Sequence, residues 1–202
     1  YKEPPYTRID QLIDDLAPEI AKDIGQSDFA LYGHGMGGII IFELARKLQE
    51  SYGLIASCVF LGSIKAPGVP EVKKFPGRRK YTAMLNNDSD ILEDVLLLGD
   101  AIPKEVVNNK EIFEIFMTSY RADLQMCSMY DFKTFKLKSP IIGFVGTEDV
   151  YDKEHLEPFS NFTTKYAKVI TVEGKHLFIS TEIGCKSVVE SIKEHWIDKT
   201  GS

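Results

Sequence analysis

The sequence predicts an α/β fold in which helices connect the strands of a parallel sheet. Four short apolar segments have the length of buried strands, and they are residues 28–32, 57–61, 141–145 and 168–172. Apolar residues at helical spacing mark amphipathic helices at residues 8–24 and 186–197, and a more apolar helix at residues 39–48. The strands are apolar on both faces, which requires layers of helices on both sides of the sheet.

Length, composition and charge are those of one globular domain over residues 1–202. The chain is 44% hydrophobic, which supplies one sizeable core, and its formal net charge is −6. Nucleic acids and anionic membranes both bind basic surfaces, so neither is expected as a partner. The sequence also contains no apolar run of about 18 residues, the length that a membrane-spanning helix requires.

The three cysteines, Cys58, Cys127 and Cys185, are widely spaced, and no pair has the spacing of metal ligands. An odd number of such cysteines is typical of free thiols in a reducing compartment. No signal-peptide pattern opens the sequence. We therefore expect a cytoplasmic protein with free thiols and no metal site.

A glycine-rich turn at residues 33–38, Gly-His-Gly-Met-Gly-Gly, lies between the first strand and an apolar helix. A strand, a tight turn of small residues and a helix form the nucleophile elbow of hydrolases, which lifts one side chain above the sheet. The helix that follows points its free N–H groups at the reacting centre. Gly35 occupies the place of the attacking side chain, so the turn has the pattern of this elbow without the nucleophile.

Two phosphate-binding loops are the alternatives for this turn. A P-loop ends in Gly-Lys-Ser or Gly-Lys-Thr, whereas residues 37–39 are Gly-Gly-Ile. A dinucleotide fingerprint needs three glycines at the spacing of Gly33, Gly35 and Gly38, which this chain has. It also needs an acidic residue at the end of the next strand, where residues 61–63 are Leu-Gly-Ser. The hydrolase interpretation is favoured, and a dinucleotide site remains the alternative.

An acid and a histidine follow the last two strands in the order that hydrolases use. Asp149 comes after residues 141–145, and His176 comes after residues 168–172. We expect Asp149 to fix the tautomer of His176, and His176 to act as general base and then as general acid. Glu148 is the competing acid. The ordered pair predicts an α/β-hydrolase.

Other side chains near these loops fit catalytic roles less well. Cys58 is expected within a strand and Ser63 at the end of the neighbouring strand, so both are poor substitutes for the missing nucleophile. The remaining histidines, His34, His155 and His195, are expected to be structural or exposed.

The pattern changes between about residues 81 and 130, where apolar helical segments follow one another with no strand between them. This segment is predicted to be a helical insertion, and in hydrolases such an insertion is commonly a lid over the active site. Residues 96–98, Phe113, Phe116 and Met117 either line an acyl channel or pack the insertion itself, and packing is favoured for most of them.

The chain resembles the type II thioesterases of polyketide and nonribosomal peptide synthesis and the related medium-chain fatty-acyl thioesterases. Residues 29–38 are similar to that family's F-A-L-F-G-H-S-M-G-A/G, in which serine stands at the position of Gly35. The other motifs cover most of the chain, and they are residues 3–7, 42–46, 66–67, 98–103, 121–123, 144–149 and 174–178.

The resemblance implies hydrolysis of acyl and peptidyl groups from the phosphopantetheine thiol of carrier proteins, which clears misprimed or stalled chains. Carrier proteins and small acyl thioesters are therefore the implied partners, and no metal or redox cofactor is implied. Serine attacks the thioester, and water then hydrolyses the acyl-enzyme. The Met36 backbone N–H is implied as one oxyanion donor. Residues 78–80, Arg-Arg-Lys, are either a contact with an acidic carrier domain or a solvated loop, and the loop is favoured.

Two features depart from the family pattern. Gly35 leaves Asp149 and His176 with no nucleophile to activate, so the chain is expected to be catalytically impaired. The family also places several strands and an F-x-x-A-G-G-type oxyanion loop before the segment that matches Tyr1, so N-terminal strands of the fold are expected to be missing. The alternative function is a non-catalytic homologue that binds acyl carrier domains or acyl ligands, and the retained Asp149 and His176 favour the enzyme.

Overall fold

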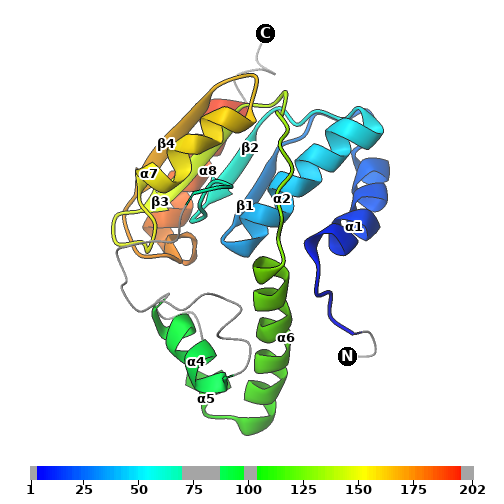
Figure 1. The fold of residues 1–202 in the computed structure, drawn as a ribbon. Helices are drawn as coiled ribbons and strands as arrows, with labels where there is room; N and C mark the ends of the chain where they lie inside the picture. The colour runs from blue at the N-terminus through cyan, green and yellow to red at the C-terminus, as the bar shows by residue number, and fades with distance from the viewer. Residues whose placement is uncertain (1–3, 70–86, 98–103, 197–202) are drawn as a thin grey trace. The chain divides into compact units, whose positions relative to one another are not determined.

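The computed structural model describes residues 4–69, 87–97 and 104–196 (Figure 1). The chain divides into two compact units. One comprises Tyr1–Leu12 with Phe75–Asp131, and the other comprises Ile13–Lys74 with Phe132–Ser202. The segment predicted as an insertion, about residues 81–130, falls in the first unit, and all four strands fall in the second.

The second unit is built on a parallel sheet whose strands lie in the order β1-β2-β3-β4. These strands are Leu31–His34, Val59–Gly62, Ile141–Gly146 and Ala167–Val172. Gly33 is opposite Leu61, and Leu61 is opposite Gly143, so the register aligns the carboxyl ends of neighbouring strands. The predicted parallel α/β architecture is confirmed.

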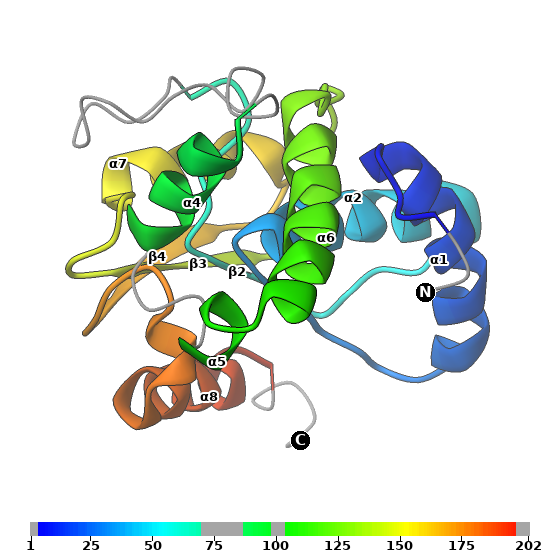
Figure 2. The ribbon, with the colours of Figure 1, turned by 90° about the horizontal axis from the view of Figure 1, so that it is seen from below.

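Helices cover both faces of this sheet. Helix α2 (Met36–Lys47) and the short helix α7 (Lys153–Leu156) lie on one face, and α8 (Glu182–Trp196) lies on the other (Figures 1 and 2). The helix α1 (Ile9–Ile24) contains Pro18 in its interior. Single turns complete the unit: a π-helical turn at Leu48–Tyr52 and 3-10 turns at Glu157–Phe162 and Phe178–Ser180.

Alternate residues of the strands supply the two layers of the core. On the α8 side, Phe60 and Phe144 are stacked with ring centroids 6.3 Å apart, and Phe178 and Val188 pack against them. Each such buried side chain contributes about 1.5–3 kcal/mol to stability. The α8 side of the sheet is therefore held by a continuous apolar cluster.

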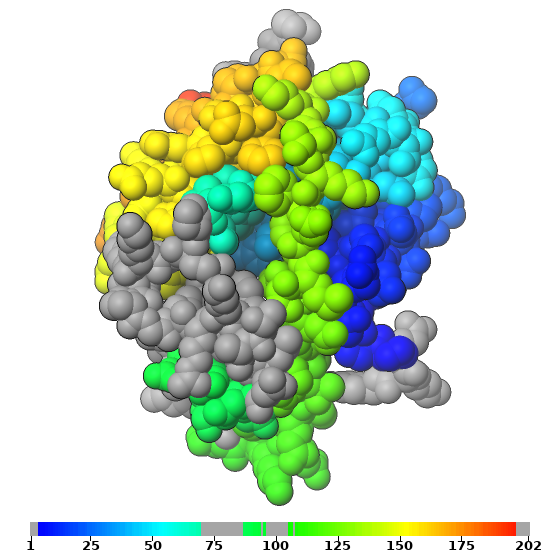
Figure 3. Space-filling model, viewed as in Figure 1, coloured from blue at the N-terminus to red at the C-terminus, as the bar shows by residue number. Residues whose placement is uncertain are grey.

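Aromatic rings fill the layer on the opposite face. Phe42 of α2 contacts Phe135, Phe159 and Phe162, with ring centroids 5.0, 5.4 and 5.8 Å away. In the space-filling view, the yellow atoms of α7 and of the 3-10 turn after it are part of the visible surface of this unit (Figure 3). Tilted and edge-to-face rings of this kind add stability beyond their buried area.

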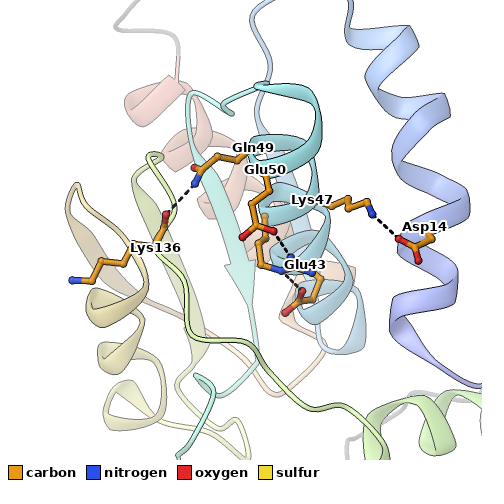
Figure 4. A network of polar contacts seen from close by, with 7 residues as sticks. Asp14, Glu43, Lys47, Gln49, Glu50 and Lys136 are labelled. Carbon is orange, nitrogen blue, oxygen red and sulfur yellow. Dashed lines mark hydrogen bonds and ion pairs between the residues drawn. The ribbon is translucent and has the colours of Figure 1, made fainter.

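Polar side chains tie α2 and the turn after it to their neighbours (Figure 4). Lys47 bonds Asp14 of α1 at 2.8 Å. The Gln49 amide donates to the Lys136 carbonyl at 3.0 Å and accepts from the Lys138 N–H at 2.7 Å. That pair of bonds pins the extended segment that leads into β3. The C-terminal end of α2 and the turn after it are thus tied to two neighbouring segments.

Three helices are described in the first unit: α4 (Asp88–Leu97), α5 (Lys104–Val107) and α6 (Lys110–Ser128). Asn109 caps α6 by accepting hydrogen bonds from the N–H groups of residues 111 and 112 at 3.1 and 3.2 Å. The unit has its own apolar core, which consists of Ile91, Val95, Met117 and Leu124 with Phe113, Phe116 and Tyr120 packed against it. The three candidates for an acyl channel that can be assessed, Phe113, Phe116 and Met117, therefore pack within the unit.

Several predicted boundaries are wrong by two or three residues, and the short elements were not predicted. β1 begins at Leu31 rather than at residue 28 and continues to His34, and β2 begins at Val59, so Cys58 directly precedes the strand. α7 and the 3-10 turns are too short to produce a periodic pattern. Two motifs, residues 78–80 and 98–103, lie outside the described residues. Within the described ranges, no helix combines the length and apolar character needed to cross a bilayer.

Gly33 in β1 and Gly37 in the first turn of α2 are expected to respond oppositely to alanine. A Cβ at Gly33 would lie 2.1 Å from the Gly37 carbonyl oxygen, whereas a Cβ at Gly37 meets no described atom within 4 Å. Gly33→Ala should lower the free energy of unfolding by about 3 kcal/mol or more, because a backbone atom cannot move aside. Gly37→Ala should raise it by up to about 1 kcal/mol, because alanine favours the helix. Urea denaturation measures both, and equal effects would contradict this geometry.

Candidate active site

Each of the four strands is followed at its carboxyl end by one residue of the site. Gly35 follows β1, Ser63 follows β2, Asp149 follows β3 and His176 follows β4. The strands are parallel and in register, so these four loops meet along one edge of the sheet. In open parallel sheets this edge is where ligands bind.

Gly35 has the backbone conformation of a sharp, strained turn. Its φ is +55° and its ψ is −126°, a backbone conformation that residues other than glycine adopt only at a cost in free energy. The Gly35 N–H donates to the Gly62 carbonyl at 2.8 Å, and the Gly35 carbonyl accepts from the Gly38 N–H at 2.9 Å. α2 begins at the next residue, Met36. The strand–turn–helix geometry of the predicted elbow is therefore present.

The position of a side chain at Gly35 can be derived from the backbone. An ideal Cβ there would lie 3.6 Å from His176 Nε2, and no other described atom outside the adjoining residues would lie within 4 Å. A hydroxyl one bond further out comes within hydrogen-bonding reach of that nitrogen. The space beside Gly35 suits a serine side chain that would face the imidazole.

Asp149 and His176 form a buried pair. Asp149 is fully buried and His176 is 8% exposed. The Asp149 carboxylate accepts from His176 Nδ1 at 2.9 Å through Oδ1 and from the Ser63 hydroxyl at 2.6 Å through Oδ2. The Tyr151 N–H adds a longer bond to Oδ1 at 3.3 Å. The carboxylate is thus bonded at both oxygens.

The pKa of Asp149 reflects two opposing influences. Burial alone would raise the pKa of this carboxyl, and it is the largest single influence. The hydrogen bond and charge of His176, with smaller contributions from Ser63 and the Tyr151 N–H, outweigh burial and hold the pKa below its usual range. Asp149 is therefore an anion at neutral pH. Its bond to Nδ1–H selects the tautomer in which the neutral imidazole has its lone pair at Nε2.

His34 supports the backbone of the histidine loop. Its Nε2 lies 2.7 Å from the His176 carbonyl oxygen, which can only accept, so Nε2 carries the hydrogen. Its Nδ1 therefore accepts from the Tyr32 hydroxyl at 3.1 Å. Burial, the largest influence, lowers the pKa of His34, although the bond to the carbonyl opposes it. A neutral His34 thus holds the carbonyl of His176 without competing for Asp149.

The remaining sequence candidates lie apart from this pair. Glu148 is exposed, and its backbone N–H bonds the Gly174 carbonyl, whereas Asp149 makes the contact with His176. Cys58 is buried in the α8 cluster and precedes the amino end of β2, so it is at the opposite end of the strand from the site. His155 closes a capping box with Asp152 at the start of α7.

Ser63 is the member of the site whose part the sequence did not reveal. The sequence suggests for it only the part of a substitute nucleophile, whereas in the structure it is fully buried and its hydroxyl bonds Asp149. Its place directly after a strand could have indicated that it belongs to the site, because the carboxyl ends of parallel strands share one edge of the sheet. In the described part of the chain, no group of three His, Cys, Asp or Glu side chains is arranged to hold a metal ion.

Comparison with known proteins gives one family. The thioesterase domain family matches residues 1–196. Linear gramicidin dehydrogenase LgrE from Brevibacillus parabrevis is 27% identical over 187 residues, which are 90% of this chain and 68% of that protein. Gramicidin S biosynthesis protein GrsT from Aneurinibacillus migulanus is 28% identical over 88% of this chain and 66% of its own length. The chain thus spans about two thirds of these relatives.

Solved structures show the same fold. ClbQ from the colibactin NRPS/PKS pathway superimposes with a TM-score of 0.81 at 23% identity, over 97% of this chain and 81% of that one. The RedJ thioesterase of the prodiginine pathway in Streptomyces coelicolor gives 0.80 at 22% identity, over 96% and 70%. The fold class predicted from the strand and helix pattern and the family predicted from the motifs are both confirmed, and the chain belongs to the thioesterase domain family.

Proposed function

We propose that this protein is built to hydrolyse acyl and peptidyl thioesters carried on the phosphopantetheine of carrier proteins. The observation that carries the proposal is the buried Asp149–His176 pair, 2.9 Å apart, with Nε2 facing the turn at Gly35. The relatives support it, because GrsT is named for gramicidin S biosynthesis and ClbQ and YbtT are named for NRPS/PKS pathways.

The proposed chemistry is two-step acyl transfer. A serine at position 35 attacks the thioester carbonyl while His176 Nε2 takes the hydroxyl proton, and Asp149 stabilises the resulting imidazolium. The C–S bond breaks, and the leaving thiol receives the proton from His176. Water then attacks the acyl-enzyme with His176 again as base, which releases the acid and restores the serine. The backbone N–H of Met36, in the first turn of α2, stabilises the oxyanion in both steps.

Gly35 removes the first of these steps in the present chain. Glycine offers no oxygen to the thioester, so His176 can act only on water. We therefore propose that this chain turns over thioesters far more slowly than a serine form, since loss of a triad nucleophile costs orders of magnitude in rate. Asp149, His176 and Met36 keep their proposed roles as orienting acid, base and oxyanion donor.

A second function follows from the same residue. If position 35 has no catalytic task, the edge of the sheet binds an acyl carrier domain or an acyl ligand without hydrolysing it. The paired Asp149 and His176 favour the enzyme, because binding alone needs no base with a free Nε2 beside the turn. For both functions, we propose that the helical insertion at about residues 81–130 serves as the lid. We also propose that the protein is cytoplasmic.

A carrier-bound substrate separates the two functions. The unchanged protein and Gly35→Ser are each mixed with a carrier protein that bears an acyl-phosphopantetheine, and intact mass of the carrier reports loss of the acyl group. We expect release by Gly35→Ser and little release by the unchanged chain. Binding of the acylated carrier by both proteins, with release by neither, would instead establish the non-catalytic function.

A further inference from the structure

Ser63 has a backbone conformation that a serine adopts only at an energetic cost. Its φ is +49°, and it is the one residue other than glycine with a positive φ in the described ranges. Its N–H donates to the Phe144 carbonyl at 2.8 Å, and the residue is fully buried. A glycine would occupy this turn without strain, so the hydroxyl is what serine adds here.

The hydroxyl lies between the two members of the Asp149–His176 pair. Ser63 Oγ is 2.6 Å from Asp149 Oδ2 and 2.9 Å from the His176 carbonyl oxygen. The hydroxyl has one hydrogen, and the charged oxygen at the shorter distance is the stronger acceptor. The His176 carbonyl already receives the Nε2–H of His34. Ser63 is therefore free to donate to Asp149.

With the Ser63 hydrogen assigned to the stronger acceptor, Asp149, the other hydrogens of these four bonds are placed as follows. The Tyr32 hydroxyl donates to His34, and His34 donates to the His176 carbonyl. Ser63 donates to Oδ2 of Asp149, and His176 Nδ1–H donates to Oδ1. The nitrogen left without a hydrogen is His176 Nε2, which faces Gly35.

We propose that Ser63 is a positioning residue of the site, whose hydroxyl fixes the Asp149 carboxylate so that Oδ1 is presented to His176 Nδ1. The Ser63 bond to Oδ2 is the shorter one, at 2.6 Å, and together with the 3.3 Å bond from the Tyr151 N–H to Oδ1 it sets the orientation of the carboxylate. Ser63 contacts Asp149 and the His176 backbone, and it acts on the reaction through them. The expected effect of Ser63 on the reaction rests on the proposed function.

The first test needs no turnover. Ser63→Ala removes the hydroxyl and keeps the strained turn, and Ser63→Gly removes it and relieves the turn. The carboxyl ¹³C shift of Asp149 and the Nδ1–H proton of His176 are followed by NMR as the pH is lowered. In both variants the pH at the midpoint of the Asp149 titration should rise by about one unit, because the charged carboxylate loses a hydrogen bond. Both variants keep His176 and His34, two ionisable side chains that act on Asp149.

A matched control distinguishes this effect from the general cost of losing a buried serine. Ser191 of α8 is also buried, and its hydroxyl has no hydrogen-bond partner among the described residues. Ser191→Ala should leave the Asp149 midpoint and the Nδ1–H resonance where they are. An unmoved Asp149 midpoint in both Ser63 variants would overturn the proposal.

The second test uses the Gly35→Ser protein. Adding Ser63→Gly should lower kcat for acyl-pantetheine hydrolysis about tenfold with KM unchanged, since the hydroxyl acts on the base and not on substrate. The two proposals fail separately. If Gly35→Ser hydrolyses nothing, the proposed function fails while the NMR result stands. If Gly35→Ser is active and Ser63→Gly changes neither the midpoint nor kcat, only the role of Ser63 fails.

Discussion

Gly35→Ser is expected to raise the rate of acyl-pantetheine hydrolysis by at least about 10³-fold, because losses of a triad nucleophile are of that order or larger. The ideal Cβ at this position lies 3.6 Å from His176 Nε2, so the new hydroxyl would come within reach of the base. His176, the proposed base, already bonds Asp149 through Nδ1. Thiol release followed with a chromogenic disulfide measures the change.

The same substitution should destabilise the protein. A serine at φ +55° and ψ −126° adopts a strained conformation, which costs about 1–3 kcal/mol. The gain in rate and the loss of stability should therefore appear together, as expected where strain is stored at a functional turn. Urea denaturation of the unchanged chain and of Gly35→Ser measures the second effect.

Gly35→Ala is the matched control for both measurements. Alanine imposes the same backbone strain and supplies no oxygen, so it should lose as much stability as serine and gain no activity. Acceleration by alanine would show that the effect comes from the backbone and not from a nucleophile. If Gly35→Ser is no more active than the unchanged chain, the proposed role of position 35 is contradicted.

Asp149→Asn in the Gly35→Ser protein is expected to lower kcat by about 10⁴-fold, because an amide holds the imidazole in the wrong tautomer. Asparagine keeps the shape of the side chain, so its bond to the Ser63 hydroxyl can persist while the bond to Nδ1–H is compromised. The pKa of Asp149 is held below its usual range. Protonation of Asp149 should therefore lower the rate of the Gly35→Ser enzyme only when the pH is well below neutral.

Glu148→Gln is the control for this substitution. Glu148 neighbours Asp149 in sequence but is exposed, so neutralising it should change kcat less than twofold. Steady-state kinetics on both variants decide between the two acids that the sequence left open. A large loss from Glu148→Gln with little loss from Asp149→Asn would reverse the assignment.

Much of this site could be predicted because its residues follow strands directly. The apolar runs before Gly35, Asp149 and His176 mark buried strands, and the order of those residues along the chain matches that of a hydrolase. The strand boundaries were less certain. β1 begins at Leu31, since pairing depends on the partner strand as well as on the apolar run.

Ser63 and His34 show where prediction from the sequence stops. His34 is the last residue of β1 and Ser63 directly follows β2, but neither position by itself shows which distant group the side chain bonds. Their partners, Asp149 and the His176 carbonyl, are 86 and 142 positions away along the chain. Contacts of that separation exist only after the sheet has formed, because register and backbone direction decide which side chains meet.

The sequence by itself thus determined the parallel α/β class and the family, and it predicted the ordered acid and histidine and the glycine at the nucleophile position. The tertiary structure decided that Asp149 and not Glu148 contacts His176, that Gly35 keeps a strained turn facing Nε2, and that Ser63 bonds the acid. The reason is physical. Strand and helix patterns are local properties of the chain, whereas hydrogen bonds between loops depend on the aligned carboxyl ends of four strands.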